Sequence, residues 1–309
     1  MIRYESLTKA YGKSVVLDSL SLNIERGEIF CLLGPNGAGK TTSLMTLATV
    51  IRPTAGTIYV DDFDVRKHPE LVRQIIGIAF QETALDSRLT IDQTLEFHGR
   101  ACGLETGALH ERAKDTLDYL DLWSDRHKKV SRISMGMKKK LEDAKLLVQR
   151  PKVAVFDEPT AFLDPTSRLR IWKRIQDLKN EGSTILIATN VMDEADKLAE
   201  RVGILYKGKL IACGSPSTLR ESVSTEEVLE IRVAGSIEDA ERLATRILGI
   251  SSVVPVRNLN ALRLYASNSE ELMPEVIRAF QSGGVKVLGV SFSTPSLDDV
   301  FLHYTGEKL

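Results

Sequence analysis

Residues 34–41 combine three glycines with a lysine and a threonine at fixed spacing. They satisfy the pattern G-x-x-x-x-G-K-[ST], which reads here as Gly34, Pro35, Asn36, Gly37, Ala38, Gly39, Lys40 and Thr41. Glycines let successive backbone N–H groups curl around phosphate oxygens, and the N-terminus of a following helix adds partial positive charge. The pattern predicts that Lys40 neutralises phosphate charge and that the Thr41 hydroxyl binds Mg²⁺. A glycine-rich turn without a ligand is disfavoured, because an apolar strand precedes the loop and an amphipathic helix follows it.

Two acidic residues end a second apolar run. Val153–Phe156 is followed at once by Asp157 and Glu158. Asp157 at the tip of a strand suits a direct or outer-shell Mg²⁺ partner, and Glu158 suits a base that polarises an attacking water. Acidic residues at a strand end are often simply solvated. That interpretation is disfavoured for Asp157 and Glu158, because the same chain contains a phosphate loop. The loop alone leaves kinases, GTPases and transport ATPases open.

Strands that alternate with helices must position these residues. The apolar runs lack period-two alternation, which indicates a parallel sheet buried on both faces. Residues 90–150 have a helical pattern. The predicted strands are 2–4, 14–17, 20–24, 29–33, 57–60, 75–79, 153–156, 184–188, 202–206 and 209–213, and the predicted helices include 40–50, 138–148 and 167–179.

The pattern changes after Glu221 to strand–helix–strand–strand–helix–strand, the order of a ferredoxin-like split βαβ unit. The predicted ranges are 227–233, 236–248, 251–257, 261–266, 269–282 and 285–293. A last short helix is predicted to begin at Pro295 with Thr294 as its N-cap. We therefore expect an α/β domain over 1–221 and a small α+β domain over 222–309.

Composition narrows the class of protein. The 309 residues carry a net charge of −1, which gives no electrostatic case for a nucleic-acid partner. Three widely spaced cysteines fit reduced thiols better than a disulfide framework. The longest apolar runs fall far short of the roughly 20 residues of a membrane span, and the first residues lack a signal-peptide pattern. We expect any membrane role to be carried by another chain.

The chain resembles the ABC ATPase family. The matching pieces are the Walker A loop at 34–41, the Walker B pair Asp157 and Glu158, and the D-loop around Leu163 and Asp164. The resemblance extends over residues 1 to about 220. It implies a P-loop ABC ATPase fold with a RecA-like parallel core, an antiparallel β subdomain and a helical subdomain at about 88–150. It also implies ATP and Mg²⁺ as ligands.

The resemblance assigns further site residues. Gln81 matches the Q-loop glutamine and Tyr11 the aromatic residue that stacks on adenine, although alone they read as a solvated loop residue and an edge-strand aromatic. The metal is expected on Thr41, Gln81 and Asp157. The expected catalytic residues are Glu158, Asn190 and Gln81. The expected nucleotide-binding residues outside the phosphate loop are Tyr11, Thr42, Ser134, Gly136 and Asp157.

Two positions depart from the family pattern. The signature L-S-G-G-Q aligns with residues 133–137, where Met135 replaces the first glycine. Ser134 and the backbone N–H of Gly136 remain, and the resemblance implies that they bind ATP held by an opposite subunit. The switch histidine aligns with Asn190, which donates an amide hydrogen bond but carries no positive charge and shuttles no proton. We therefore expect slow hydrolysis.

The segment 295–301 is similar to the tail of ATPase subunits from drug- and antibiotic-export systems. The leading interpretation is an ATPase at the cytoplasmic face of the cell membrane, which energises separate transmembrane permease subunits and pairs with a second ATPase subunit. One alternative is a nucleotide-gated structural subunit that hydrolyses poorly. Another is a soluble ABC-type protein acting on ribosomes or DNA, which the lack of a basic extension disfavours. Residues 222–309 fit a stabilising or dimerising appendage as well as a regulatory domain.

Overall fold

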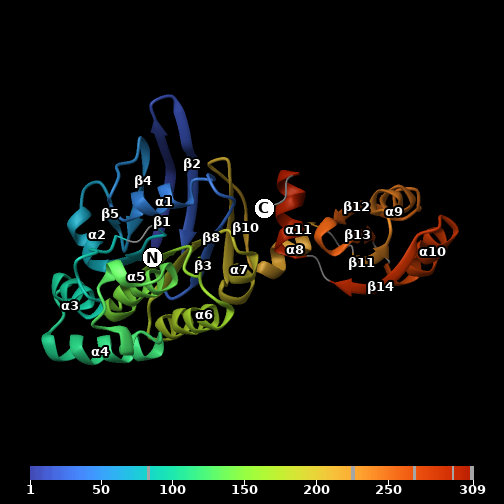
Figure 1. Ribbon diagram of the computed structural model, residues 1–309. Coiled ribbons are helices and arrows are strands. Elements are labelled where there is room, and N and C mark those ends of the chain that lie inside the picture. Colours follow the sequence, from blue (N-terminus) through green and yellow to red (C-terminus); the bar gives the residue numbers. More distant parts are fainter. Residues whose placement is uncertain (82–83, 224–226, 267–268, 294–295, 307–309) are drawn as a thin grey trace. The chain divides into compact units, whose positions relative to one another are not determined.

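The computed structural model describes residues 1–81, 84–223, 227–266, 269–293 and 296–306, and Figure 1 shows its ribbon. The chain divides into two compact units, Met1–Pro216 and Ser217–Lys308. Helix α8 (Pro216–Val223) begins at this division. The boundary that the sequence predicts at residue 221 lies inside that helix.

The first unit is built around a six-stranded sheet with the order β10-β9-β3-β8-β7-β6. Every neighbouring pair is parallel except β10 with β9. Strands β3, β7 and β8 are buried along their whole length, which is why their sequences are continuous apolar runs. The expected parallel core is confirmed. Its strands are β3 (Ile29–Leu33), β6 (Ile76–Ala79), β7 (Val153–Asp157), β8 (Thr184–Thr189), β9 (Arg201–Tyr206) and β10 (Lys209–Gly214).

A four-stranded antiparallel sheet with the order β2-β1-β4-β5 forms the second layer. The three short strands predicted before residue 25 all lie in strands, but their bounds are too short, because the chain forms two long strands here. β1 and β2 are interrupted by register shifts, and Ser6 and Ser19 adopt positive φ angles of 46° and 53°. Such bulges break the sequence periodicity without ending the strand. The bounds are β1 (Ile2–Tyr11), β2 (Ser14–Ile24), β4 (Ala55–Val60) and β5 (Phe63–Asp64).

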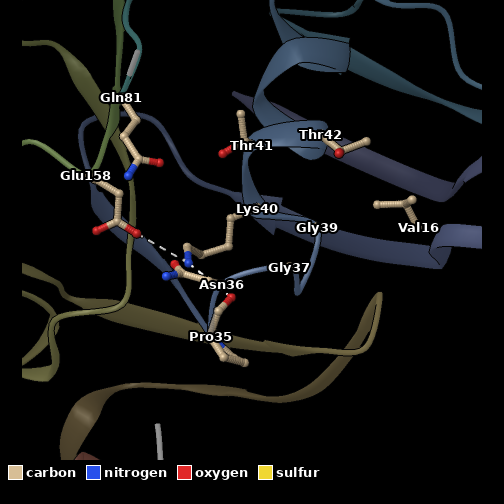
Figure 2. A pocket seen from close by; sticks show the side chains of 10 residues that line it. All are labelled: Val16, Pro35, Asn36, Gly37, Gly39, Lys40, Thr41, Thr42, Gln81 and Glu158. Atoms are coloured by element: carbon tan, nitrogen blue, oxygen red, sulfur yellow. Dashed lines mark hydrogen bonds and ion pairs between the residues drawn. The ribbon is translucent and has the colours of Figure 1, made fainter.

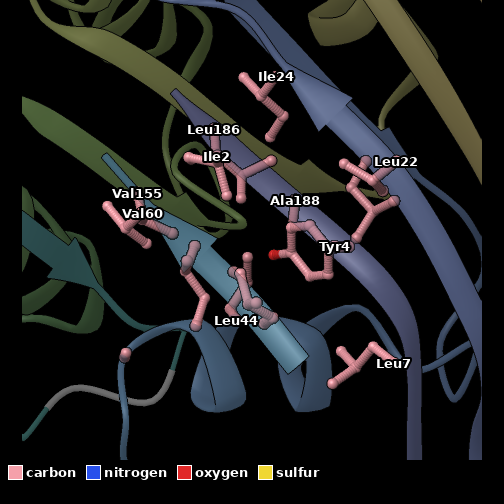
Figure 3. Packing of buried hydrophobic residues seen from close by; sticks show 14 of the residues in the cluster. Ile2, Tyr4, Leu7, Leu22, Ile24, Leu44, Val60, Val155, Leu186 and Ala188 are labelled. Atoms are coloured by element: carbon pink, nitrogen blue, oxygen red, sulfur yellow. The ribbon is translucent and has the colours of Figure 1, made fainter. Parts of the chain in front are cut away.

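The two sheets enclose one apolar core together with helix α1 (Lys40–Leu47), as Figure 3 shows. Ile2 and Tyr4 of the antiparallel sheet and Val155 and Leu186 of the parallel sheet belong to the same buried cluster. Leu44 on α1 lies in this cluster as well. Helix α1, which follows the phosphate loop, is therefore held in place by its packing in this core.

Helices α3, α4 and α5 pack against one another in the segment predicted to be helical (Figure 1). Thr90 begins α3 with a capping box that Gln93 completes. Ser134 caps α5, so this helix begins three residues before the predicted Lys138. The remaining bounds of the unit are α2 (Pro69–Ile75), α3 (Ile91–Ala101), α4 (Thr106–Tyr119), η1 (Trp123–Asp125), η2 (Val130–Arg132), α5 (Met135–Gln149), α6 (Pro165–Asn180) and α7 (Met192–Leu198).

The second unit contains an antiparallel sheet with the order β12-β13-β11-β14. β13 is inserted between β11 and β12, and β11 between β13 and β14, so both βαβ units are split as in a ferredoxin-like fold. Helices α9 and α10 share one core with alternate residues of β11. The bounds are β11 (Glu227–Ala234), α9 (Ile237–Ala244), β12 (Ile250–Val256), η3 (Arg257–Leu259), β13 (Ala261–Ala266), α10 (Ser269–Ser282), β14 (Lys286–Ser293) and α11 (Leu297–Thr305).

Helix α11 is held to this sheet by its first turn. Ser296 and Asp299 form a capping box, so the prediction of Thr294 as N-cap and Pro295 as first residue is wrong. Thr294 and Pro295 themselves lie outside the described residues. Asp299 also accepts hydrogen bonds from the Tyr265 hydroxyl and, at 3.4 Å, from Arg263 of β13. Across both units, none of the described helices has the length and apolar character needed to cross a bilayer.

Candidate nucleotide-binding site

The loop between β3 and α1 has a backbone that requires glycine at three positions. Gly37 and Gly39 adopt φ angles of 81° and 106°, a region that other residues rarely occupy. A Cβ on Gly39 would lie 2.7 Å from the Leu17 side chain. A Cβ on Gly34 would lie 2.2 Å from the Leu205 carbonyl oxygen. The glycines predicted from the sequence therefore serve the curled backbone that phosphate binding needs.

This loop lines an open pocket of about 350 Å³. Figure 2 shows Lys40 and Thr41 reaching it from the start of α1, Gln81 from the segment after β6 and Glu158 from the end of β7. Ala38 is the loop residue that points elsewhere, because its side chain is buried in the core. The lining residues are Val16, Pro35, Asn36, Gly37, Gly39, Lys40, Thr41, Thr42, Gln81 and Glu158.

Lys40 is buried at the centre of the loop. Its ammonium donates to the carbonyl oxygens of Gly34 at 2.7 Å and Pro35 at 3.3 Å. It also forms an ion pair with Glu158, with 3.3 Å between Nζ and Oε1 (Figure 2). The positive charge expected to meet phosphate is thus held in place by the loop and by the candidate base.

Asp157 and Thr41 are the residues whose oxygen atoms suit a metal ion. The Thr41 hydroxyl donates to Oδ2 of Asp157 at 2.8 Å. The other oxygen, Oδ1, is buried and has no hydrogen-bond partner in the described part of the chain. Burial raises the pKa of the Asp157 carboxyl, and the Thr41 hydrogen bond opposes that shift. A buried carboxylate oxygen without a partner, next to a hydroxyl, fits a Mg²⁺ ion, which prefers oxygen ligands.

Glu158 has a left-handed backbone with φ of 49°, which is uncommon outside glycine. Its N–H donates to the Ala188 carbonyl at 2.8 Å, which anchors this turn to β8. Its second carboxylate oxygen, Oε2, accepts from the Thr189 hydroxyl and the Asn190 N–H, each at 3.3 Å. Strained backbone of this kind concentrates at functional sites, and here it turns the carboxylate toward the pocket.

Asn190 reaches the phosphate loop from the end of β8. Its side-chain amide donates to Oδ1 of Asn36 at 3.4 Å. The structure therefore brings together the phosphate loop, Asp157, Glu158 and Asn190, which the sequence assigned to one site. Gln81 lines the same pocket from the segment after β6.

Two family models match the chain. The model described as "ABC transporter" matches residues 17–161, and the model "ATP-binding protein DrrA1-3-like, C-terminal domain" matches residues 214–305. A daunorubicin resistance ATP-binding protein of Streptomyces coeruleorubidus is 35% identical over 307 residues, which cover 99% of this chain and 96% of the relative. The chain belongs to the ABC transporter ATP-binding protein family. A linearmycin resistance ATP-binding protein of Bacillus subtilis is 31% identical over 310 residues, covering 100% of this chain and 99% of the relative.

Solved ABC ATP-binding subunits have the same fold as the first unit. An ATP-binding subunit of an ABC transporter matches with a TM-score of 0.68 and 25% identity, covering 72% of this chain and 92% of the other. A dimeric ATP-binding cassette in a post-hydrolysis state, bound to ADP and Pi, matches with a TM-score of 0.65 and 26% identity. That match covers 70% of this chain and 98% of the other.

In this ABC ATP-binding protein the signature residues lie apart from the chain's own phosphate pocket. Ser134 accepts from the Met137 N–H at 3.2 Å, and neither Ser134 nor Gly136 lines the pocket among the described residues. The side chain of Met135 is 56% exposed. A Cβ on Gly136 would lie 3.3 Å from the Phe162 carbonyl oxygen. The signature turn therefore packs closely against the D-loop.

Tyr11 also lies outside the pocket lining. It ends β1 with half of its surface exposed, and the Lys9 ammonium lies 4.8 Å from the centre of its ring. Because half of Tyr11 is exposed, the ring is not packed into the sheet edge, and its stacking on adenine stays a prediction.

Sequence reasoning missed two residues near the site. Val16 of β2 lines the pocket beside the loop. Lys139 of α5 is buried and donates to the carbonyl oxygen of Asp157. The available signal was its spacing, because Lys139, Asp143 and Leu146 lie on one face of the helix, whereas Lys138 and Lys140 do not.

Proposed function

We propose that this chain is the Mg²⁺-dependent ATPase subunit of an exporter for drug- or antibiotic-like compounds. The observation that carries the proposal is the pocket where the Lys40 ammonium, the Thr41–Asp157 pair and the Glu158 carboxylate meet. The export direction rests on relatives named as resistance and export ATP-binding proteins, including a Nod factor export ATP-binding protein of Burkholderia lata at 35% identity over 310 residues.

The phosphate loop and Lys40 bind the nucleotide's phosphates. The positive φ angles of Gly37 and Gly39 curl the loop, and the Lys40 ammonium donates to the Gly34 carbonyl oxygen of the same loop. Thr41 and Asp157 would hold Mg²⁺, with Gln81 of the pocket lining as a further ligand. The metal supplies neutralisation of the charge on the phosphates when it is bound. The adenine is expected to stack on Tyr11.

Glu158 accepts the proton of the attacking water. Its carboxylate lies at the pocket and is oriented by Lys40, Thr189 and the Asn190 N–H. Asn190 offers the γ-phosphate a neutral amide where the family has histidine. One preorganised donor at a developing charge is worth about 3–4 kcal/mol. Hydrolysis is therefore expected to be slow.

The partners follow from the residues that lie outside the pocket. Ser134 and Gly136 are not among the described residues that line the chain's own pocket, so we expect a second ATPase subunit, identical or related, to complete each site. The closure of the two ATPase subunits is transmitted to separate transmembrane permease subunits at the cytoplasmic face of the membrane. The contact is expected in the region of Gln81 and residues 88–150. No nucleic acid is expected as a partner. The ATPase domain corresponds to residues 1–221 and an accessory domain to 222–309.

A second candidate is a nucleotide-gated subunit that binds ATP and dimerises without useful turnover. Asn190 and the exposed Met135 favour it, whereas the oriented Glu158 opposes it. Steady-state ATP hydrolysis by the purified chain, with and without Mg²⁺, tests the choice. We expect slow turnover that requires the metal and is lost in Glu158→Gln. Tight ATP binding with no turnover above the level of Glu158→Gln establishes the second candidate instead.

A further inference from the structure

Helix α5 carries a buried ion pair one turn from its start. The side chain of Lys139 is 1% exposed and that of Asp143 is 0% exposed, and their charged atoms lie 3.4 Å apart. Two charges removed from water stabilise a fold only when further hydrogen bonds accompany the pair. The partners of Lys139 therefore indicate what the pair does.

The Lys139 ammonium bridges the ends of two neighbouring strands. It donates to the carbonyl oxygen of Asp157 at 3.2 Å and to that of Phe80 at 3.4 Å. Asp157 is the last residue of β7, and Phe80 directly follows β6, its neighbour in the sheet. At these same strand ends, the Asp157 carboxylate accepts from the Thr41 hydroxyl and Gln81 lines the nucleotide pocket.

The evident role of the Asp143 carboxyl is to face the Lys139 ammonium. Neither of its carboxylate oxygens has a hydrogen-bond partner among the described residues, so Lys139 is the contact that compensates it. The acidic groups near it are Glu142 and Glu194, and Lys139 is the cation that faces it. If the pair only stabilised the fold, two apolar residues of similar volume at positions 139 and 143 would serve equally well. The hydrogen bonds to the strand ends require an N–H donor at position 139.

We propose that Lys139 is a positioning residue of the nucleotide site. Its ammonium fixes the spacing of the β6 and β7 ends, and thereby places the Asp157 carboxylate against Thr41 and opposite Gln81. Asp143 faces this ammonium from the next turn of the helix, with 3.4 Å between the charged atoms. Ser134 caps the same helix. A displacement of α5 therefore moves Lys139 and the two strand ends to which it donates. The metal-binding strand is thus connected mechanically to the signature turn. The inference rests on the proposed ATPase function.

Three variants separate positioning from stability. Lys139→Met leaves the Asp143 carboxyl buried without its cation and is expected to unfold more easily than the wild type. The double variant Lys139→Met with Asp143→Leu removes both charges and keeps the volume. The double variant Lys139→Gln with Asp143→Leu retains an NH₂ group that donates to the two carbonyls. We expect both double variants to melt close to the wild type.

Amide hydrogen exchange, measured without nucleotide, reports directly on the stability of the β6 and β7 ends. In the Met–Leu double variant, amides within 76–81 and 153–158 should exchange about fivefold faster or more, while those of β11 and β13 stay unchanged. The Mg²⁺ concentration for half-maximal ATP turnover should rise by a similar factor. The Gln–Leu double variant should recover most of both effects.

Wild-type exchange at both segments in the Met–Leu double variant overturns the proposal and leaves the pair a structural one. Unaltered Mg²⁺ dependence alongside faster exchange also overturns it, because the Lys139 contacts then have no effect on the metal site. If the wild-type chain does not hydrolyse ATP, the proposed function fails. The exchange data then still decide whether Lys139 holds the two strand ends.

Discussion

Lys40 and Glu158 form a buried ion pair at the floor of the nucleotide pocket, with 3.3 Å between Nζ and Oε1. The group expected to bind phosphate and the group expected to activate water are thus in direct contact and carry opposite charges. Phosphate oxygens must replace the carboxylate as partners of Lys40. That exchange also frees Glu158 to accept a proton, so binding and activation of the base are linked by one contact.

Lys40→Ala should weaken Mg-ATP binding by about 1.5–3 kcal/mol, or roughly 10- to 150-fold, because a charge-assisted hydrogen bond is lost. Glu158→Gln should bind ATP at least as tightly as the wild type, since the competing carboxylate is gone. Calorimetry measures both. Lys13→Ala, an exposed lysine in the first hairpin, is the control and should be neutral. Unchanged ATP affinity in Lys40→Ala would sink the phosphate-loop assignment.

Glu158→Gln should also accumulate a dimer in the presence of Mg-ATP. Ser134 and Gly136 lie outside the chain's own pocket, so they are available to a nucleotide held by a second copy. Without the base, hydrolysis no longer reopens the dimer. Light scattering with and without Mg-ATP measures the mass. A variant that stays monomeric at high concentration contradicts self-pairing and points to a different partner subunit.

The pH dependence of stability should change in Asp143→Asn. Burial raises the pKa of the Asp143 carboxyl from 3.8 to about 7 in the folded protein. Between these values the folded state holds a proton that the unfolded chain has lost, so wild-type stability falls as pH rises toward 7 and then levels off. Asp143→Asn lacks this contribution. Its stability relative to the wild type should rise with pH, by up to about 1.4 kcal/mol per unit between pH 5 and 7.

Thermal unfolding from pH 5 to 8 measures that difference. The comparison cancels groups common to both proteins, such as His98, whose pKa burial lowers to about 4. Asp115→Asn on the exposed face of α4 is the matched control and should leave the slope unchanged. Parallel stability curves for Asp143→Asn and the wild type would show that Asp143 is ionised throughout this range.

Much of the site was predictable because local sequence determines it. The loop glycines, Lys40 and the acids after β7 sit at strand ends, where chain direction alone brings them to one edge of the sheet. Lys139 was not predictable in the same way, because its partners, Phe80 and Asp157, are backbone carbonyls that only the folded sheet brings together. Strand bulges at Ser6 and Ser19 likewise depend on pairing between strands and hid the true length of β1 and β2.

A chain ending at residue 216 should retain the nucleotide site. The division into compact units falls there, and every described residue that lines the pocket lies before it. We expect ATP affinity within about twofold of the full chain, a difference below ~0.5 kcal/mol. Calorimetry on the truncated protein checks this. Insoluble protein, or loss of ATP binding, would show that the first unit depends on the second for its folding.

Asn190→His should raise steady-state ATP hydrolysis by at least about fivefold. The Asn190 N–H already donates to Glu158, and that contact survives any side chain, so the variant changes only what reaches the phosphate loop. A preorganised donor at a developing charge is worth about 3–4 kcal/mol, and the amide of Asn190 recovers part of it. The gain should appear mainly in kcat, because the contact strengthens as charge moves onto the γ-phosphate.

Asn190→Ala supplies the matched comparison, since it removes the amide and keeps the backbone contact to Glu158. It should hydrolyse ATP more slowly than the wild type, and ATP affinity should change little in either variant. Met135→Gly should add to the gain of Asn190→His, because the signature turn then approaches the partner's nucleotide more closely. Equal turnover in the histidine, asparagine and alanine forms would mean that this position does not contact the reacting phosphate. In that case the slow step would have to lie in dimer closure, where Met135→Gly alone would change the rate.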